Sequence, residues 1–311
     1  MSDQSDDSEN QFQKGDIVTC FNEILEENLE AKIIDVQKRG SRLCAYLNFI
    51  GKDKRIDDWY PLDNLKPAKP KEIDDESNDE EESEEVAYQG QDERNFEIAH
   101  QKITKMRNIE NIVVGEYKIR AWYYSPYPPP FHDCKTLYLC DRCFRYFKTK
   151  PGLEEHLTDY EGHQPYGREI YRDGQLSIFE MKGDCQKLPC QCLCLLGKLF
   201  LDHKTLYYNV EGFSFYVLFE VDDEGYHIAA YCSREIDNDI HNILSTIVVL
   251  PPFQNKGYGR ILIALCYEIG RRKQLPGGPE RPLSDLGERA FCSFWKDRII
   301  ECLRDYGGKI R

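Results

Sequence analysis

Apolar and β-branched residues run together over positions 243–250, a pattern typical of a strand that is buried on both faces. Pro251 and Pro252 end this strand, because proline cannot donate a hydrogen bond to a sheet. Residues 254–260 (QNKGYGR) then carry two glycines one residue apart, which predicts a tight turn. From about Arg260 onward the spacing of apolar residues predicts a buried helix.

The glycine turn directly precedes this predicted helix. Two close glycines let successive backbone N–H groups approach a ligand, and the N-terminus of a helix carries a partial positive charge. Together they predict an anion site suited to a pyrophosphate. An ordinary strand-turn-helix connection would show the same local pattern, so the turn alone does not define a function.

Short stretches of alternating apolar and polar residues fill positions 12–67 and predict a small all-β barrel. These stretches lie at 16–19, 31–36, 43–50 and 57–61. Tyr46, Phe49 and Trp59 either face a groove that accepts a methylated ammonium by cation–π attraction or form the barrel core. Residues 1–11 are acidic and polar, and we expect them to be disordered.

Composition narrows the class of protein. A chain of 311 residues suggests about two domains, and no apolar run is long enough to span a membrane. Thirteen cysteines without a secretory signal indicate reduced thiols, and with them the cytosol or the nucleus. The net charge of -14, much of it in an acidic linker at 68–94, favours a basic partner. It weighs against nucleic-acid binding by the whole chain and leaves direct binding uncertain.

The rest of the chain mixes predicted strands and helices. We expect strands at 112–114, 117–124, 205–208, 213–219 and 226–231, a helix from about 190 that ends near 202–204, and a second helix at 296–306. Cys190 and Cys194 share one face of the first helix, so we interpret them, with Cys192, as buried apolar thiols rather than metal ligands.

Cys140, Cys143 and His156 have the spacing of a zinc finger. Two residues separate the cysteines and twelve separate Cys143 from the histidine, so a turn supplies two thiolates and a helix supplies an imidazole. These three residues predict structural zinc, and His163 is the predicted fourth ligand. Two alternatives remain: zinc with a different fourth ligand, and a finger that binds no metal and is held together by packing.

Four segments, taken together, resemble the MYST family of lysine acetyltransferases. They are the turn at 254–260 after Pro-Pro, and residues 167–172 (GREIYR), 201–208 (LDHKTLYY) and 279–287 (PERPLSDLG). The resemblance extends from about Asn95 to the C-terminus. Residues 12–67 are similar to the chromo-barrel that precedes many MYST domains, although Lys52 stands where family members carry another aromatic residue.

The resemblance implies an α+β fold of the acyl-CoA N-acyltransferase (GNAT-like) type, with a mixed central sheet, flanking helices and a zinc-finger subdomain. The domain would span 95–311, with the finger at about 134–165, an acetyl-CoA core at about 170–275 and a C-terminal part at 276–311. In the family finger, a cysteine ligand stands where this chain has Tyr160.

The resemblance also assigns roles to individual residues. Glu280 would be the general base, Lys204 the site of autoacetylation, and Thr246 stands at the position of a family cysteine. Backbone groups of three residues would hold the pantetheine arm, the turn would hold the pyrophosphate, and two serines would contact the cofactor. These residues are Ile247, Val248 and Val249; Gln254, Asn255, Lys256, Gly257, Tyr258, Gly259 and Arg260; and Ser284 and Ser293.

The predicted function is transfer of acetyl from acetyl-CoA to lysine in histone tails or nucleosomes, in the nucleus and with partner subunits. Threonine is a poor nucleophile without a base beside it, so Thr246 favours direct attack by lysine in a ternary complex. The alternative is a weakly active or inactive scaffold that binds chromatin. A third class, a nucleic-acid-binding finger protein, is disfavoured by the negative charge.

Overall fold

The computed structural model describes residues 12–68, 104–132, 134–160, 164–236 and 242–305. The chain divides into two compact units, Met1–Arg107 and Asn108–Arg311. The predicted disordered N-terminus, nearly all of the predicted acidic linker, and His163 lie outside the described residues.

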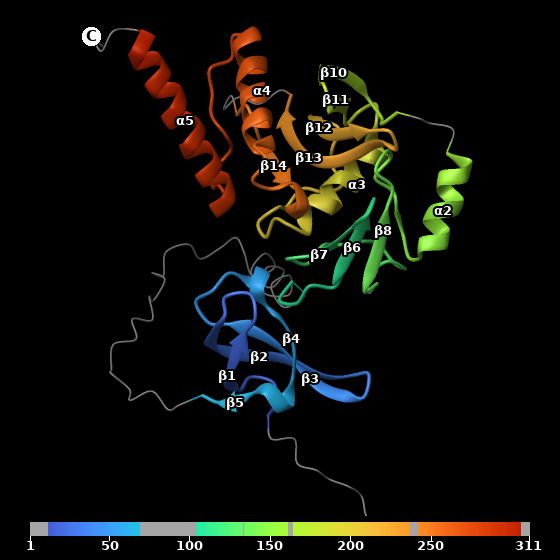
Figure 1. Cartoon of the computed structure of the whole chain (residues 1–311), viewed down its shortest axis with the longest axis vertical. Coiled ribbons are helices and arrows are strands. Elements are labelled where there is room, and N and C mark those ends of the chain that lie inside the picture. Colours follow the sequence, from blue (N-terminus) through green and yellow to red (C-terminus); the bar gives the residue numbers. More distant parts are fainter. Residues whose placement is uncertain (1–11, 69–103, 133, 161–163, 237–241, 306–311) are drawn as a thin grey trace, which may run out of the picture. The chain divides into compact units, whose positions relative to one another are not determined.

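The first unit contains a five-stranded antiparallel sheet (Figure 1). Its strands run in the order β4-β3-β2-β1-β5. They are β1 (Ile17–Asn22), β2 (Glu27–Arg39), β3 (Arg42–Phe49), β4 (Asp58–Pro61) and β5 (Lys66–Pro67). Alternate residues of β1 to β3 point inward and form a separate apolar core that includes Val18, Ile33 and Leu47, as the period of two requires. The four strands predicted in this region are therefore confirmed.

Two of the three aromatic residues considered for a groove lie inside this unit. Tyr46 and Phe49 are both 1% exposed, and Tyr46 packs edge-on against Trp59 with ring centroids 5.4 Å apart. The Arg107 guanidinium lies over the Tyr46 ring, 6.0 Å from its centroid, and donates a 2.6 Å hydrogen bond to the carbonyl oxygen of Asp57. Phe49 belongs to the apolar core of this unit, as the second interpretation requires. Tyr46 is buried on the other face of β3, against Trp59 and Arg107.

The second unit begins with a small four-stranded sheet of order β7-β6-β8-β9. It consists of β6 (Asn111–Val114), β7 (Tyr117–Arg120), β8 (Thr136–Leu139) and β9 (Tyr146–Phe147), and α2 (Lys150–Asp159) follows. The cysteine turn lies between β8 and β9, and His156 lies on α2. The strand predicted at 117–124 is shorter in the structure, because pairing with β6 stops at Arg120.

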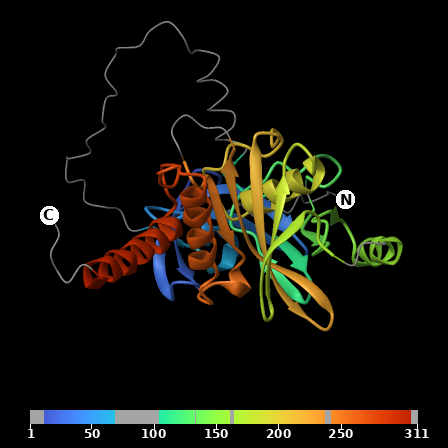
Figure 2. The ribbon, with the colours of Figure 1, turned by 90° about the horizontal axis from the view of Figure 1, so that it is seen from above.

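The central sheet of the second unit has the order β10-β11-β12-β13-β14, and every neighbouring pair is antiparallel. Its strands are β10 (Arg168–Asp173), β11 (Leu176–Lys182), β12 (Phe213–Asp222), β13 (Gly225–Glu235) and β14 (Thr246–Val249). Three helices accompany them: α3 (Lys187–Lys198), α4 (Tyr258–Arg272) and α5 (Asp285–Asp305). These helices and strands confirm the predicted α+β class (Figures 1 and 2). The prediction of a mixed central sheet is wrong for the described strands, because every neighbouring pair is antiparallel.

Helices α3 and α4 cover opposite faces of this sheet. Tyr231 of β13 approaches Gly197 of α3, whereas the Sγ atom of the next residue, Cys232, lies 3.6 Å from the Sγ atom of Cys266 on α4. Successive side chains of a strand point to opposite faces, so the two helices enclose β13 between them. Cys190, Cys192 and Cys194 are buried on α3, as the sequence predicts for apolar thiols.

One predicted strand is wrong, and one predicted helix is confirmed but starts earlier than predicted. No strand forms at 205–208, because Tyr208 bonds elsewhere: its hydroxyl donates to the Pro126 carbonyl at 2.8 Å, and its carbonyl accepts from Gln191 Nε2 at 2.7 Å. The helix predicted at 296–306 begins much earlier, at Asp285. Ser284 precedes its first turn, where the Ser284 hydroxyl accepts the N–H of Gly287 at 3.1 Å.

No helix in the described ranges is both long enough and apolar enough to cross a bilayer.

The contact between Gly197 and Tyr231 yields a test of how α3 packs on the sheet. A Cβ atom on Gly197 would lie 1.8 Å from the Tyr231 hydroxyl oxygen, so Gly197→Ala should destabilise the protein by about 3 kcal/mol. That hydroxyl is buried and has no hydrogen-bond partner among the described residues, so Tyr231→Phe alone should be close to neutral.

The double variant should recover most of the stability lost by Gly197→Ala, because the next nearest ring atom is 2.9 Å away instead of 1.8 Å. Urea unfolding of the four proteins measures this coupling. Strictly additive effects of the two substitutions would contradict the packing described here.

Candidate functional site

β14 is the last strand of the central sheet, so only one of its two edges pairs with a strand in the described part of the chain. Its register with β13 runs from Ser233↔Thr246 to Ala230↔Val249. In an antiparallel pair, alternate residues direct their N–H and C=O groups to the partner strand, and the others direct them outward. The outer edge of β14 therefore offers backbone donors and acceptors to an extended ligand.

The segment around Glu280 pairs with residues 243–244, directly before β14, and so covers this edge of the chain up to the start of the strand. The N–H of Ile243 donates to the Gly278 carbonyl at 2.9 Å, and the N–H of Glu280 donates to the Leu244 carbonyl at 2.8 Å. A parallel bridge joins Leu244 to Pro279, and in the described ranges no strand pairs further along this edge. The exposed Glu280 is thus attached where the covered part of the edge meets the open part.

The turn predicted as an anion site connects β14 to α4. Gly257 occupies the N-cap position of α4 in the left-handed conformation, with φ of 87°, and Asn255 also has a positive φ of 64°. Glycine has no side chain with which to cap a helix, so in the described ranges no N-cap side chain accepts a hydrogen bond from the first N–H groups of α4. These free donors, at the positive end of the helix dipole, make the turn suitable for an anion.

Side chains of the turn hold it in place from within the protein. Gln254 Nε2 donates to the Val249 carbonyl at 3.0 Å. Lys256 Nζ donates to Glu220 Oε1 at 2.8 Å, and the Tyr258 hydroxyl donates to the same carboxylate oxygen. The turn therefore presents mainly its backbone to a ligand, while its polar side chains fix its shape.

The last residue of the turn, Arg260, reaches α5. Its Nη1 atom lies 2.5 Å from Asp297 Oδ2 and 3.5 Å from the Ser293 hydroxyl. Ser284, the other serine predicted to contact the cofactor, lies at the start of α5, and its hydroxyl accepts the Gly287 N–H. The structure thus brings Arg260 and Ser293 together and gives Ser284 a bond to its own helix.

Lys204 and Thr246, singled out separately in the sequence, are neighbours. Lys204 Nζ donates to the Thr246 hydroxyl at 3.3 Å, and both residues are partly buried. Thr246 is the first residue of β14, so the lysine ammonium lies at the start of the open edge.

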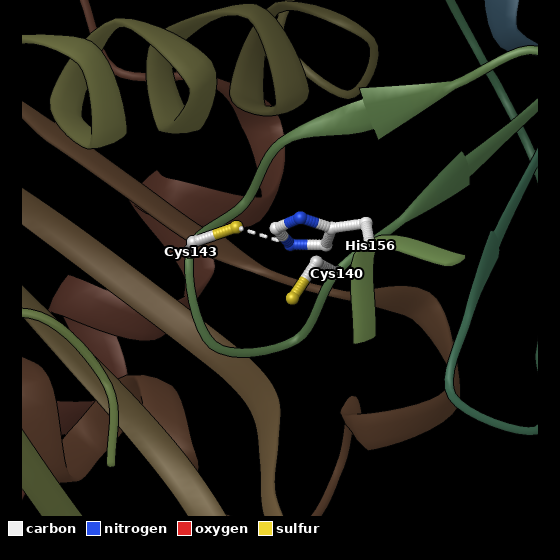
Figure 3. Close-up of side chains that lie close together, drawn as sticks. All are labelled: Cys140, Cys143 and His156. Carbon is white, nitrogen blue, oxygen red and sulfur yellow. Dashed lines mark hydrogen bonds between the residues drawn. The ribbon is translucent and has the colours of Figure 1, made fainter. Parts of the chain in front are cut away.

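The finger residues Cys140, Cys143 and His156 form a cluster whose ligand atoms all lie within 4.8 Å of one another (Figure 3). Cys143 Sγ is 3.2 Å from His156 Nε2. Tetrahedral zinc holds its ligand atoms about 3.5–3.8 Å apart, so the cluster fits this metal. The Cys143 thiol and backbone amides of the turn hydrogen-bond the Cys140 sulfur and lower the pKa of the Cys140 thiol, which favours the thiolate form that zinc binds.

An ionic contact ties the cysteine turn to the central sheet. His227 of β13 lies with Nδ1 3.8 Å from Asp141 Oδ2 and with Nε2 3.0 Å from Asp222 Oδ1. The same Asp141 side chain accepts the Ile228 N–H at 3.3 Å. The two carboxylates, Asp141 first, raise the pKa of His227 to about 9, so the imidazole is protonated at neutral pH.

These features together define a class: an α+β domain with a structural zinc cluster, an open sheet edge and a turn suited to an anion at the start of a helix. We call this turn, residues 254–260, the anion turn. Comparison with known families identifies it further. Residues 164–310 match the MOZ/SAS family, and residues 106–159 match the MYST family zinc finger domain. The chain belongs to the MYST family.

Several curated proteins are similar to this chain. Histone acetyltransferase of the MYST family 2 from Arabidopsis thaliana is 38% identical over 279 residues, which are 85% of this chain and 63% of that protein. Histone acetyltransferase MOF from Drosophila melanogaster is 43% identical over 209 residues, 67% of this chain and 25% of that protein. Histone acetyltransferase esa1 from Emericella nidulans is 42% identical over 206 residues, 66% of this chain and 41% of that protein. The chain thus spans less than two thirds of the length of these relatives.

Glu220 and Asp297 support the turn, and sequence reasoning missed both. Each is a single carboxylate in an ordinary strand or helix pattern. Each bonds to a residue of the turn that lies more than thirty positions away in the sequence. No local signal in the sequence identifies such a partner.

The zinc cluster predicts one zinc ion per chain. Cys143→Ser should remove most of the metal and lower the thermal stability, because a structural zinc site contributes its binding free energy to folding. Elemental analysis and a thermal melt measure both effects. Cys185→Ser is a matched control, since Cys185 is exposed and outside the cluster, and it should keep the metal.

His163→Ala, measured in the same way, tests the fourth ligand: lost zinc would support His163, and retained zinc would exclude it. A metal-free Cys143→Ser protein as stable as the unmodified protein would contradict a structural role for zinc.

The His227 contact predicts a pH-dependent stability. Because folding raises the pKa of His227 from 6.5 to about 9, its contribution is complete below pH 6.5 and disappears as the pH rises through 9. His227→Gln should therefore reduce the free energy of unfolding by about 1 kcal/mol at pH 6 and by much less at pH 10. Urea unfolding of both proteins at both pH values, with zinc present, measures the difference. An equal loss at the two pH values would contradict this assignment.

Proposed function

We propose that this chain is a histone acetyltransferase that transfers acetyl from acetyl-CoA to the ε-amine of lysine in histone tails. The observation that carries the proposal is the arrangement along β14. Glu280 is attached at the start of the open edge, and the anion turn follows the end of the strand. The similar proteins named above are histone acetyltransferases, which supports the histone substrate.

The open edge and the turn suit two parts of one ligand. The amide groups of a pantetheine arm can pair with outward-facing backbone groups of residues 247–249, as an added strand would. A pyrophosphate then meets the N–H groups at the start of α4. This arrangement directs the thioester end of the ligand back toward Thr246 and Glu280.

The chemical problem is the substrate amine. A lysine amine has a pKa of about 10.4, so removing its proton at pH 7 costs about 4.6 kcal/mol. A positioned general base contributes roughly 10²–10⁴-fold in rate. In our proposal the Glu280 carboxylate accepts this proton, directly or through a water molecule, and the free amine attacks the thioester carbonyl. The carbon–sulfur bond then breaks, and coenzyme A leaves as a thiolate that takes up the proton lost by the nitrogen as the amide forms.

The environment of Thr246 supports direct attack. Its hydroxyl accepts a hydrogen bond from Lys204, whose ammonium group is a donor and cannot act as a base while it is protonated. No acetylated threonine is therefore needed, and lysine would attack in a ternary complex. By family membership we also propose Lys204 as a residue that becomes acetylated, and its hydrogen bond to Thr246 at the start of β14 supports this proposal.

By family membership we further propose that the protein acts in the nucleus, on nucleosomes and within a complex of several subunits. The acidic character of the whole chain, with its net charge of -14, suits basic histone tails.

Glu280→Gln should lower kcat by about 10²–10⁴-fold, because the amide cannot accept the proton. Binding of coenzyme A should change little, since the backbone contact of residue 280 is kept. Steady-state acetylation of a histone peptide and calorimetry with coenzyme A measure the two quantities. Glu288→Gln, an exposed carboxylate in the first turn of α5, is the matched control and should keep full activity.

Full activity of Glu280→Gln would contradict the assignment of the base. Parallel lines in a two-substrate kinetic analysis, or acetyl label on Thr246 without peptide, would instead contradict the ternary complex. An unmodified protein that binds coenzyme A but acetylates no peptide would favour the alternative of an inactive scaffold.

A further inference from the structure

A single carboxylate, that of Glu220, bonds to both residues that flank Gly257. Lys256 Nζ lies 2.8 Å from Glu220 Oε1, and the Tyr258 hydroxyl donates to the same oxygen. Glu220 belongs to β12, in the interior of the central sheet order, whereas the turn leaves the edge strand β14. The carboxylate therefore joins the turn to a rigid part of the sheet.

Aromatic contacts surround this carboxylate contact. Lys256 Nζ lies 5.0 Å from the centroid of the Phe253 ring, and that ring packs edge-on against Tyr117 at 5.1 Å. The Tyr258 side chain is only 9% exposed. Tyr258 is therefore held by packing as well as by its hydrogen bond, whereas Lys256, whose side chain is 45% exposed, is held by Glu220 and by its contact with Phe253.

The turn needs such support because of its backbone. Gly257 has a φ of 87°, and glycine loses more conformational freedom on folding than any other residue. Its N–H groups bind an anion well only if they already point in the right direction, since ordering them upon binding would cost free energy. Fixing the residues on both sides of Gly257 removes most of that cost.

The charge of Glu220 does not conflict with an anion at the turn. The Lys256 ammonium compensates the carboxylate at 2.8 Å, so the pair is close to neutral as seen by a ligand. Lys256 is also directed to the carboxylate, which leaves the backbone amides as the main donors.

We propose that Glu220 is a positioning residue for acetyl-CoA: it holds the turn in the conformation that binds the pyrophosphate and takes no part in acetyl transfer. This inference rests on the proposed function of the site. It predicts a defect that depends on the pyrophosphate of the acetyl donor and on no other part of it.

The test compares two acetyl donors, acetyl-CoA and S-acetylpantetheine, which lacks the pyrophosphate and the nucleotide. Glu220→Gln should raise the KM for acetyl-CoA about tenfold, with kcat and the KM for peptide unchanged, since the hydrogen bonds from Lys256 and Tyr258 then go to a neutral amide oxygen and are weaker. With S-acetylpantetheine, kcat/KM should stay the same. Tyr258→Phe, which keeps the ring and loses the hydroxyl, should give a smaller rise, and the double variant should be less than additive.

Glu180→Gln is the matched control. Glu180 is a partly buried carboxylate of the same sheet that also bonds one cation, Arg168 at 2.9 Å, and one tyrosine hydroxyl, Tyr216 at 3.3 Å. It has no contact with the turn among the described residues, and its substitution should leave the ratio of kcat/KM for the two donors unchanged.

An unchanged or lower KM for acetyl-CoA in Glu220→Gln would overturn the inference, because loss of a nearby negative charge alone would improve anion binding. An equal loss with both donors would also overturn it, since that result indicates a general structural defect.

The proposed function can fail while the inference about Glu220 still holds. If the unmodified protein acetylates no peptide with either donor, the proposed function fails, and calorimetry with coenzyme A still tests the inference. A Kd about tenfold higher in Glu220→Gln would then support it, and an equal Kd, or no binding by either protein, would overturn it.

Discussion

The structure of the site depends on the two edges of one short strand. β14 uses its inner edge to pair with β13, and residues 278–280 bond to Ile243 and Leu244, directly before the strand. In the described ranges no strand pairs with the outer edge of β14, where the Val249 carbonyl accepts Gln254 Nε2. Backbone hydrogen-bonding groups must find partners, so the other groups of this edge are left to water or a ligand. In the function proposed above, this open edge determines which end of the ligand meets Glu280 and which end meets the anion turn.

The position of β14 depends in turn on β13, which lies between two helices. Tyr231 contacts Gly197 of α3 on one face, and Cys232 contacts Cys266 of α4 on the other. The absence of a side chain at Gly197 lets α3 approach closely. Because α4 begins with the anion turn, the contacts that place β13 also place the turn relative to β14.

Local sequence patterns were sufficient for the parts of the site that follow one another along the chain. The apolar run, the two prolines and the glycines predict the strand, its end and the turn, and all three are present. Local sequence patterns gave wrong or missing predictions where residues far away in the sequence determine the structure. Residues 205–208 look like a strand, yet Tyr208 bonds to Gln191 and Pro126 instead of a neighbouring strand. Glu220 and Asp297 carry no sequence signal, because only the fold brings them to the turn.

In the turn, the side chains fix the conformation and the backbone offers the hydrogen-bond donors. A site in which lysine and arginine side chains held the phosphates would bind through flexible groups, each of which loses rotamer freedom on binding. Here Gln254, Lys256 and Arg260 are already bonded to Val249, Glu220 and Asp297. Their entropy is lost when the protein folds, before any ligand arrives. The glycine backbone can then bind an anion with little further ordering, which is why a turn rich in polar side chains can function mainly through its main chain.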